Sequence, residues 1–190
     1  MAVRRIPMKR IRSERYKKLN IDRKWILLGL FGFILSFFIN IWPVIFISIF
    51  CIANAILLSI DRYVNAPIDI ELSTFSAVLI TTQYGLKWGI AVAILTKLAA
   101  IMYNKNIRVD HFFMIGGYVL AAFMANLLLG MPIVLLGILV TIITNTYVMF
   151  VSKFITMLSP YEIMMYGSSN FIFNSVLFLG FSEFFLMIMP

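Results

Sequence analysis

The sequence predicts an all-α fold: a polytopic integral membrane bundle of six to seven transmembrane helices. Its 190 residues are 62% hydrophobic and only 13% charged, whereas soluble domains are roughly 45–50% apolar and roughly 25% charged. The apolar residues fall in long uncharged runs that are separated by short polar segments. Because backbone polar groups in lipid must be satisfied within their own segment, each long run is expected to be a helix.

Residues 1–24 form a basic tail that precedes the predicted bundle over 25–190. The tail contains ten lysines and arginines against two acids, Glu14 and Asp22, whereas the remaining residues carry six charges of each sign. Basic segments beside membrane helices stay in the cytoplasm and contact anionic lipid head groups. We therefore predict a multi-pass plasma-membrane protein with a cytoplasmic N-terminus. The alternative is that the tail docks a cytoplasmic partner; no nucleic-acid-binding fold accompanies it.

The first two spans are predicted within residues 25–60, which contain no formal charge. One helix of that length would measure about 54 Å, far more than a hydrocarbon core of about 30 Å. The chain is therefore expected to fold back at "NIWP", where Pro43 suits the first turn of a second helix. The predicted spans are 25–41 and 43–60.

The next three spans are separated by polar segments. Residues 68–84 and 88–103 flank "YGLKWG", and the charged loop "NKNIRVD" follows the second of them. Asp110 is of a residue type that favours the N-cap, which predicts a helix over 111–129.

The C-terminal part begins at "GMP", after which a helix is predicted over 132–152. In "SPYE", Ser159 is expected at an N-cap, Pro160 at N1 and Glu162 at N3. We predict that 154–167 is an interfacial or re-entrant helix, and that 168–188 is the last span.

The basic residues of the predicted loops set the orientation of the bundle. With the N-terminus inside, the outer turns hold Lys87 alone, and the inner loops hold Arg62, Lys105, Arg108 and Lys153. This excess favours six crossings up to Lys153 and a seventh that ends outside. Because the loops are short, neighbouring spans are expected to be antiparallel.

Three charged residues in and before the predicted spans 68–84 and 88–103 are candidates for a structural or binding role. Asp69 and Glu71 stand at the start of the 68–84 run, where carboxylates stabilise the positive end of a helix, so we favour a capping role for them. The alternative is that they bind something. Lys97 lies inside the 88–103 span, where its ammonium either snorkels to the interface or pairs with Asp69, Glu71 or a ligand anion.

Asparagines recur on the last three predicted spans and are the candidate substrate-binding residues. Asn170 and Asn174 are four residues apart and share one helix face. Interhelical hydrogen bonding explains any single one of them equally well. The predicted polar cavity comprises Asn126, Asn145, Asn170 and Asn174, with Thr81, Thr82, Gln83 and Thr141 as further polar groups nearby.

Small residues recur at four-residue spacing on two predicted spans, and such spacing allows helices to approach closely. One stripe is Gly85, Gly89 and Ala93, and the other is Gly117, Ala121 and Ala125. We favour packing within the bundle for such stripes. The alternative is a contact with another subunit, for which the Gly85 stripe is the candidate.

The sequence favours a binding protein over an enzyme. His111 is the single histidine, and the chain has no HExxH, CxxC, GxSxG or P-loop motif. The short loops also hold few convergent polar groups. We therefore predict no catalytic residue, no metal site and no cofactor.

The run "PIDIELSTFSAVLITTQYGLKWGIAVAI" resembles the substrate-capture (S) components of energy-coupling factor transporters. It is also similar to the MreD family of rod-shape membrane proteins. The matching positions are Pro67, Asp69, Gly85 and Gly89, and "NKNIRVDHFFMIGGYVLAAFMANLL" extends the likeness to about residue 128. S components have six helices, and the resemblance would place Asp69 at the membrane face opposite to that given by the charge count.

The resemblance implies a subunit that binds a vitamin or similar micronutrient and has no ATPase of its own. Its partners would be a membrane coupling subunit and two cytoplasmic ATPases, besides the lipid bilayer. The alternative function is a non-catalytic scaffold or assembly subunit of the MreD type. A transport subunit is expected to contain a polar and aromatic cavity, whereas a scaffold is expected to have a dry interior and an exposed groove.

Overall fold

The computed structural model describes residues 40–60, 67–105, 107 and 109–190. The predicted basic tail and the predicted span 25–41 lie outside the described residues, apart from the last two positions of that span. The described residues form six helices: α2 (Ile41–Ile60), α3 (Ser73–Tyr84), α4 (Leu86–Asn104), α5 (Val109–Leu127), α6 (Ile133–Phe154) and α7 (Pro160–Ile188). All of them except α3 are long and apolar enough to span a membrane. The all-α bundle is therefore confirmed, with five helices that could span a membrane.

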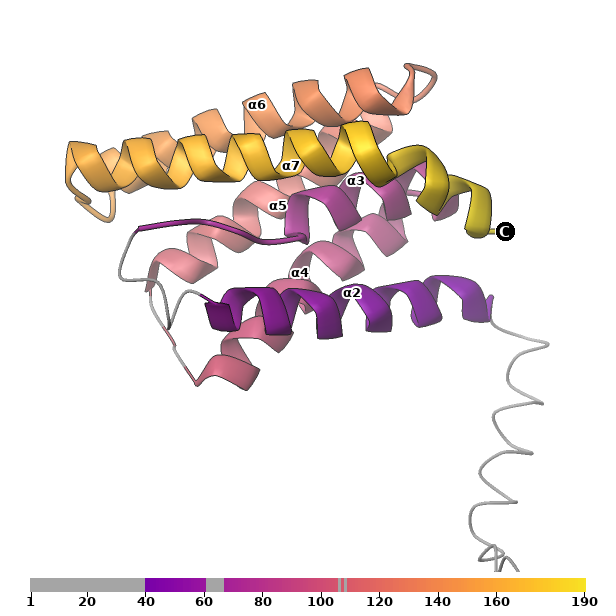
Figure 1. The fold of residues 1–190 in the computed structure, drawn as a ribbon, viewed down its shortest axis with the longest axis horizontal. Coiled ribbons are helices and arrows are strands. Elements are labelled where there is room, and N and C mark those ends of the chain that lie inside the picture. The colour runs from indigo at the N-terminus through magenta and orange to yellow at the C-terminus, as the bar shows by residue number, and fades with distance from the viewer. Residues whose placement is uncertain (1–39, 61–66, 106, 108) are drawn as a thin grey trace, which may run out of the picture. The chain divides into compact units, whose positions relative to one another are not determined.

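The prediction of one helix over 68–84 is wrong in its first third. Residues 67–71 have no regular secondary structure, Leu72 forms a bend, and α3 begins only at Ser73. With 12 residues, α3 is about 18 Å long and does not cross a 30 Å core alone. The preceding segment, residues 67–72, has no regular secondary structure and extends along the bundle to the start of α3 (Figure 1). We call it the entry segment.

The predicted division between 154–167 and 168–188 is also wrong, because α7 is one helix of 29 residues. The cap predicted at its start is confirmed. The side chain of Ser159 accepts a hydrogen bond from the Glu162 backbone (3.3 Å), and the Glu162 carboxylate accepts one from the Ser159 backbone (2.9 Å). Nothing between Pro160 and Ile188 breaks the helix. The interfacial residues therefore continue directly into the last span.

The remaining boundaries agree with the sequence to within a few residues. Pro43 lies in the first turn of α2, as predicted. Asp110 lies in the first turn of α5 instead of at its N-cap. Gly85 (φ +89°) joins α3 to α4, and Gly130 (φ +100°) lies between α5 and α6. Both have the positive φ that glycine adopts without strain, which permits these short connections.

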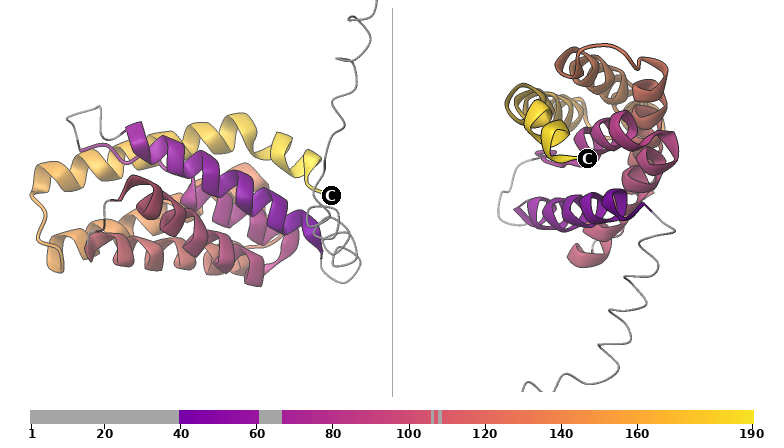
Figure 2. Two further views of the ribbon diagram at one scale, coloured as in Figure 1. Left: turned by 90° about the horizontal axis from the view of Figure 1, so that it is seen from below. Right: turned by 90° about the vertical axis from the view of Figure 1, so that its right-hand side faces the viewer.

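Helix α3 is the centre of the bundle. It contacts each of the other five helices, and every residue from Ser73 to Thr81 is buried. Figures 1 and 2 show α6 and α7 side by side on one side of it, and α2 and α4 on the other. A helix without a polar face is expected at such a buried position.

Different helix connections lie at the two ends of the bundle. At one end α2, α4 and α6 finish, and α5 and α7 begin; this is called the loop end below (Figure 1). The other end holds the α3–α4 and α5–α6 turns and the C-terminus. There the Gln83 side chain donates a hydrogen bond to the Met189 carbonyl (2.9 Å), which fastens the end of α7 to α3.

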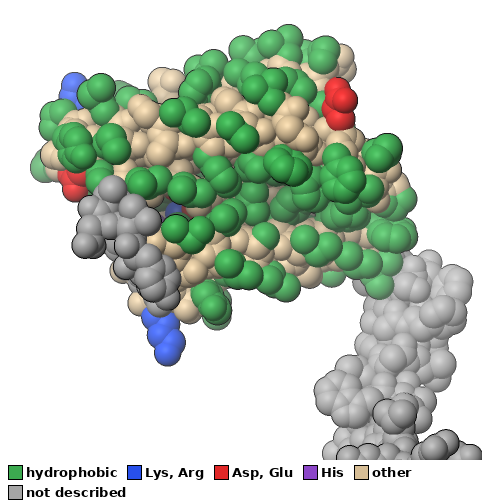
Figure 3. Space-filling view, in the orientation of Figure 1, with side chains coloured by type: hydrophobic (Ala, Val, Ile, Leu, Met, Phe, Trp, Pro, Cys, Tyr) green, Lys and Arg blue, Asp and Glu red, His purple; other side chains and the backbone are tan. Residues whose placement is uncertain are grey.

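Aromatic side chains fill the core around α3. The ring of Phe75 lies 5.0 Å from that of Phe178 and 5.7 Å from that of Phe185, and Phe50 lies 5.3 Å from Phe185. Many large apolar side chains also point outward, and they cover much of the face shown in Figure 3. An exterior of this kind suits lipid as the surrounding solvent.

Candidate functional site

The entry segment requires hydrogen-bond partners from other parts of the chain, because it lacks the internal bonds of a helix. Irregular backbone at membrane depth is tolerated only where protein or a water-filled cavity surrounds it. The backbone N–H of Asp69 donates to the Ser169 hydroxyl on α7 (2.9 Å), and that of Leu72 donates to Asn54 Oδ1 on α2 (2.6 Å). The segment is therefore held from two sides.

Asn54 joins three elements at the start of α3. Its Nδ2 donates to the Ser73 hydroxyl and to the Thr96 carbonyl on α4, both at 3.2 Å. The side chain is fully buried. Asn54 was not among the predicted site residues, although a lone amide inside the uncharged run 43–60 was a usable signal.

Glu71 and Lys97 form an ion pair inside the bundle. Lys97 Nζ lies 2.6 Å from Glu71 Oε2, and the two side chains are 1% and 0% exposed. The capping interpretation of Asp69 and Glu71 is therefore wrong, since both precede the helix and Leu72 occupies its N-cap position. Snorkelling of Lys97 is wrong as well, because the lysine turns inward. The alternative of an ion pair with Glu71 is confirmed.

The other carboxylate of the entry segment, Asp69, is bound by α7. Asn170 Nδ2 donates to Asp69 Oδ2 (2.9 Å). Asn174 Nδ2 in turn donates to the backbone carbonyl of Asn170 (3.0 Å) and to its Oδ1 (3.1 Å). The two asparagines lie on one helix face, as predicted, and orient the Asp69 carboxylate.

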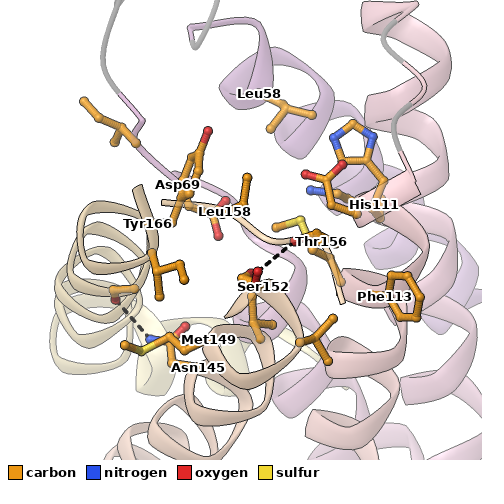
Figure 4. A pocket seen from close by; sticks show the side chains of 18 residues that line it. Leu58, Asp69, His111, Phe113, Asn145, Met149, Ser152, Thr156, Leu158 and Tyr166 are labelled. Carbon is orange, nitrogen blue, oxygen red and sulfur yellow. Dashed lines mark hydrogen bonds between the residues drawn. The ribbon is translucent and has the colours of Figure 1, made fainter. Parts of the chain in front are cut away.

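A cavity opens beside these two carboxylate sites at the loop end. The space that the centre of a water molecule can occupy is about 60 Å³, compared with the roughly 10–15 Å³ that one water needs. Figure 4 shows side chains from the entry segment, α5, α6 and α7 around it. Its main polar lining comprises Asp69, Lys97, Asp110, His111, Asn145 and Tyr166.

Several elements contribute apolar residues to the cavity lining. Leu58 on α2, Met149 on α6 and Leu158 in the α6–α7 connection are among these residues. Ligand sites in proteins commonly combine such apolar walls with a few placed polar groups. The cavity therefore has the composition of a small-molecule site.

The four candidate asparagines fall into three different places. Asn145 lines the cavity, and its Nδ2 donates to the Gly167 carbonyl (3.3 Å). Asn170 and Asn174 are buried and support Asp69 without lining the cavity. Asn126 is exposed near the C-terminal end of α5, sixteen residues beyond Asp110 and hence about 24 Å away along the helix.

The other polar groups proposed for the cavity lie elsewhere. Thr81, Thr82 and Gln83 belong to the last turn of α3, at the end opposite the loop end. Thr141 is buried on α6 and donates to the Gly137 carbonyl of its own helix (2.7 Å). The cavity is also lined by Asp69, Lys97, Asp110, His111 and Tyr166. These residues were not predicted to converge, because they come from the entry segment, α4, α5 and α7, which are far apart in the sequence.

The candidate partner stripe Gly85, Gly89 and Ala93 packs inside this chain. A Cβ at Gly89 would lie 1.8 Å from the hydroxyl oxygen of Thr81 on α3. Ala93 is fully buried, and Gly85 forms the α3–α4 turn. The stripe brings α4 close to α3, so Gly89 and Ala93 present no surface to another subunit in this fold.

The second stripe also makes internal contacts. A Cβ at Gly117 would lie 3.1 Å from Val148 Cγ2 on α6. Ala121 and Ala125 are fully buried. Both stripes therefore serve close packing between helices of the same bundle.

Within the described residues, no group of three or more histidine, cysteine or acidic side chains is arranged to hold a metal ion. Comparison of the chain with protein-family models, with curated proteins and with solved structures found no match. The resemblance of residues 67–94 to S components and to MreD proteins stays a prediction.

Proposed function

We propose that this chain is the small-molecule-binding subunit of a membrane transporter and has no ATPase of its own. The observation that carries the proposal is the cavity at the loop end, where charged, amide and aromatic side chains from five elements face one space. Polar groups at membrane depth are costly, and their convergence is typical of substrate pathways and binding sites. Energy would come from a coupling subunit and cytoplasmic ATPases.

The alternative function, a non-catalytic scaffold of the MreD type, predicts a dry and fully packed interior. The cavity and its hydrogen-bonded carboxylate Asp69 favour a binding role over that alternative. A scaffold gains nothing from keeping Asp69, Glu71 and Lys97 in the bundle, because apolar side chains of similar volume are often equally stabilising or more so.

The proposed topology has six crossings over the described residues. The entry segment adds at most about 20 Å of chain to the 18 Å of α3, so together they cross the membrane once. Capture of a ligand from outside the cell requires the loop end to face outward. This agrees with the orientation implied by the resemblance and differs from that given by the loop charges.

Cysteine labelling tests the orientation. Lys153 is exposed at the loop end, and Lys87 is exposed at the other. In a background in which the single cysteine, Cys51, is replaced by alanine, Lys153→Cys should react with an impermeant maleimide added to intact cells. Lys87→Cys should react only after lysis. The reverse pattern would place the cavity toward the cytoplasm and contradict capture from outside.

Mass spectrometry of small molecules retained by the purified protein tests the binding function itself. The wild-type protein, purified under conditions that keep tight ligands, should release a molecule on denaturation. Asn145→Leu alters the cavity wall and should lower the retained amount. Asn126→Leu is the matched control, because it makes the same change at an exposed position far from the cavity, and it should retain the wild-type amount. A wild-type protein that retains nothing would contradict the proposed function.

A further inference from the structure

Lys97 is a charged residue in the cavity lining. It lines the cavity from α4, seven residues before that helix ends at Asn104, which corresponds to about 10 Å along the axis. Its side chain is 99% buried, so the ammonium does not reach bulk water. A polar group that enters the cavity can meet this ammonium.

The charge of Lys97 is balanced by the protein. Glu71 Oε2 lies 2.6 Å from Nζ, and the ring of Tyr118 lies 5.9 Å from it. An ammonium carries three N–H donors, and Glu71 is its one hydrogen-bond acceptor among the described residues. The lysine therefore offers donors without offering net charge.

Two further polar atoms close to Lys97 lack a hydrogen bond within the described part of the chain. They are Glu71 Oε1 and the Tyr118 hydroxyl, and both are buried. Buried polar atoms are normally satisfied by protein, water or ligand. Neither Glu71 nor Tyr118 is among the residues that line the cavity, so the donor that faces a ligand there belongs to Lys97.

Electrostatics selects the chemical group that fits these atoms. An anion at Lys97 would stand beside the Glu71 carboxylate. In a low-dielectric interior such like-charge contacts are costly. A cation at the same position would be repelled by the ammonium. An uncharged carbonyl accepts from Lys97 without adding charge.

We infer that Lys97 binds an uncharged carbonyl of the transported molecule, which is then a neutral carbonyl compound such as an amide, a lactam or a urea. This inference rests on the proposed function, since it identifies the chemistry of the same cavity. Glu71 is a positioning residue: it holds the ammonium in place and cancels its charge. The ion pair is therefore retained for ligand selection.

The test compares molecules retained by the wild-type protein, by the double variant E71Q/K97Q and by the control Asn126→Leu. The double variant removes both charges together, so no unpaired charge is left in the core. Released molecules are identified by mass spectrometry in both ion modes, and folding is checked by gel filtration and thermal unfolding. Loss of a hydrogen bond from a charged donor should lower retention by about tenfold to hundredfold.

The expected result is an uncharged, carbonyl-containing molecule that the wild type and the control retain and that the double variant loses. A retained carboxylate, phosphate or amine without such a carbonyl overturns the inference and leaves the proposed function standing. Equal retention by the folded double variant overturns it too. The identity of the wild-type molecule decides the matter even if the double variant does not fold. A wild type that retains nothing overturns the proposed function and this inference together.

Discussion

The part of the bundle built around α3 and the part built around the entry segment are packed in different ways. Around α3, Phe50, Phe75, Phe178 and Phe185 contact one another, and the helix satisfies its own backbone. Around the entry segment, the backbone and both carboxylates are bonded to side chains of α2, α4 and α7. One part is dry, whereas the other is polar and contains the cavity.

This difference shows how a small bundle separates stability from binding. Close apolar packing holds the helices together, and it leaves no space for a ligand. The irregular segment before α3 places backbone and carboxylates inside the bundle, and these need partners from three other helices. The same partners position the polar lining of the cavity. The predictions below disturb either the dry part or the polar part.

Removal of the buried cation should have the largest effect. Lys97→Gln leaves the Glu71 carboxylate buried without its 2.6 Å partner. Breaking a buried ion pair from one side costs about 3–5 kcal/mol, so we expect a loss of that order in the free energy of unfolding in detergent. The double variant E71Q/K97Q should recover most of it. If Lys97→Gln unfolds like the wild type, the polar part does not depend on this ion pair.

A single methyl group in the dry part should have the next largest effect. A Cβ added at Gly137 on α6 would lie 2.2–2.4 Å from atoms of the buried Phe178 ring. Overpacking of this kind costs up to about 3 kcal/mol. Gly137→Ala should therefore lower the unfolding temperature clearly.

Gly180 provides the matched control for that substitution. A Cβ there meets no atom within 4 Å, and alanine is the better helix former by up to about 1 kcal/mol. Gly180→Ala should therefore be neutral or slightly stabilising. Equal unfolding temperatures for the two alanine variants would show that the contact between α6 and α7 is not tight.

Asn54 lies where the two parts meet, and its loss should cost about 2 kcal/mol. In Asn54→Leu the backbone N–H of Leu72 loses its 2.6 Å acceptor inside the bundle, and an unpaired buried group of this kind costs about 1–3 kcal/mol. Asn126→Leu makes the same change at an exposed position and should be neutral. Thermal unfolding of both variants measures the difference. A stable Asn54→Leu would mean that water replaces the amide.

The sequence predicted those elements whose signals are local. Long apolar runs predicted four helices to within a few residues, because a span in lipid has to be apolar and helical along its length. Ser159, Pro160 and Glu162 predicted the start of α7, since a capping box depends on residues within one turn. A capping box indicates where a helix begins and not how long it is, so it did not reveal that Pro160–Ile188 is one helix.

The polar part was harder to predict because its contacts are distant in sequence. Asp69 and Glu71 satisfied the pattern of a helix start, and only the positions of Asn170 and Lys97 in space show that they bind other helices instead. Hydropathy likewise does not distinguish an entry segment from a helix of the same composition. Of the candidate asparagines, Asn145 lines the cavity and Asn126 lies far from it, because residue type alone does not determine which helix face turns inward.

Loss of the α7 cap should have the smallest effect. Ser159→Ala removes the hydroxyl that accepts from the Glu162 backbone, and such a change typically costs about 1 kcal/mol. Ser48→Ala is the control, because the Ser48 hydroxyl donates only to the Val44 carbonyl of its own helix. The cap adjoins the cavity, since Leu158 and Ile163 line it. If the start of α7 helps to shape the site, Ser159→Ala should also lower ligand retention, whereas Ser48→Ala should not. Unchanged retention with a lowered unfolding temperature would assign the cap to the stability of α7 alone.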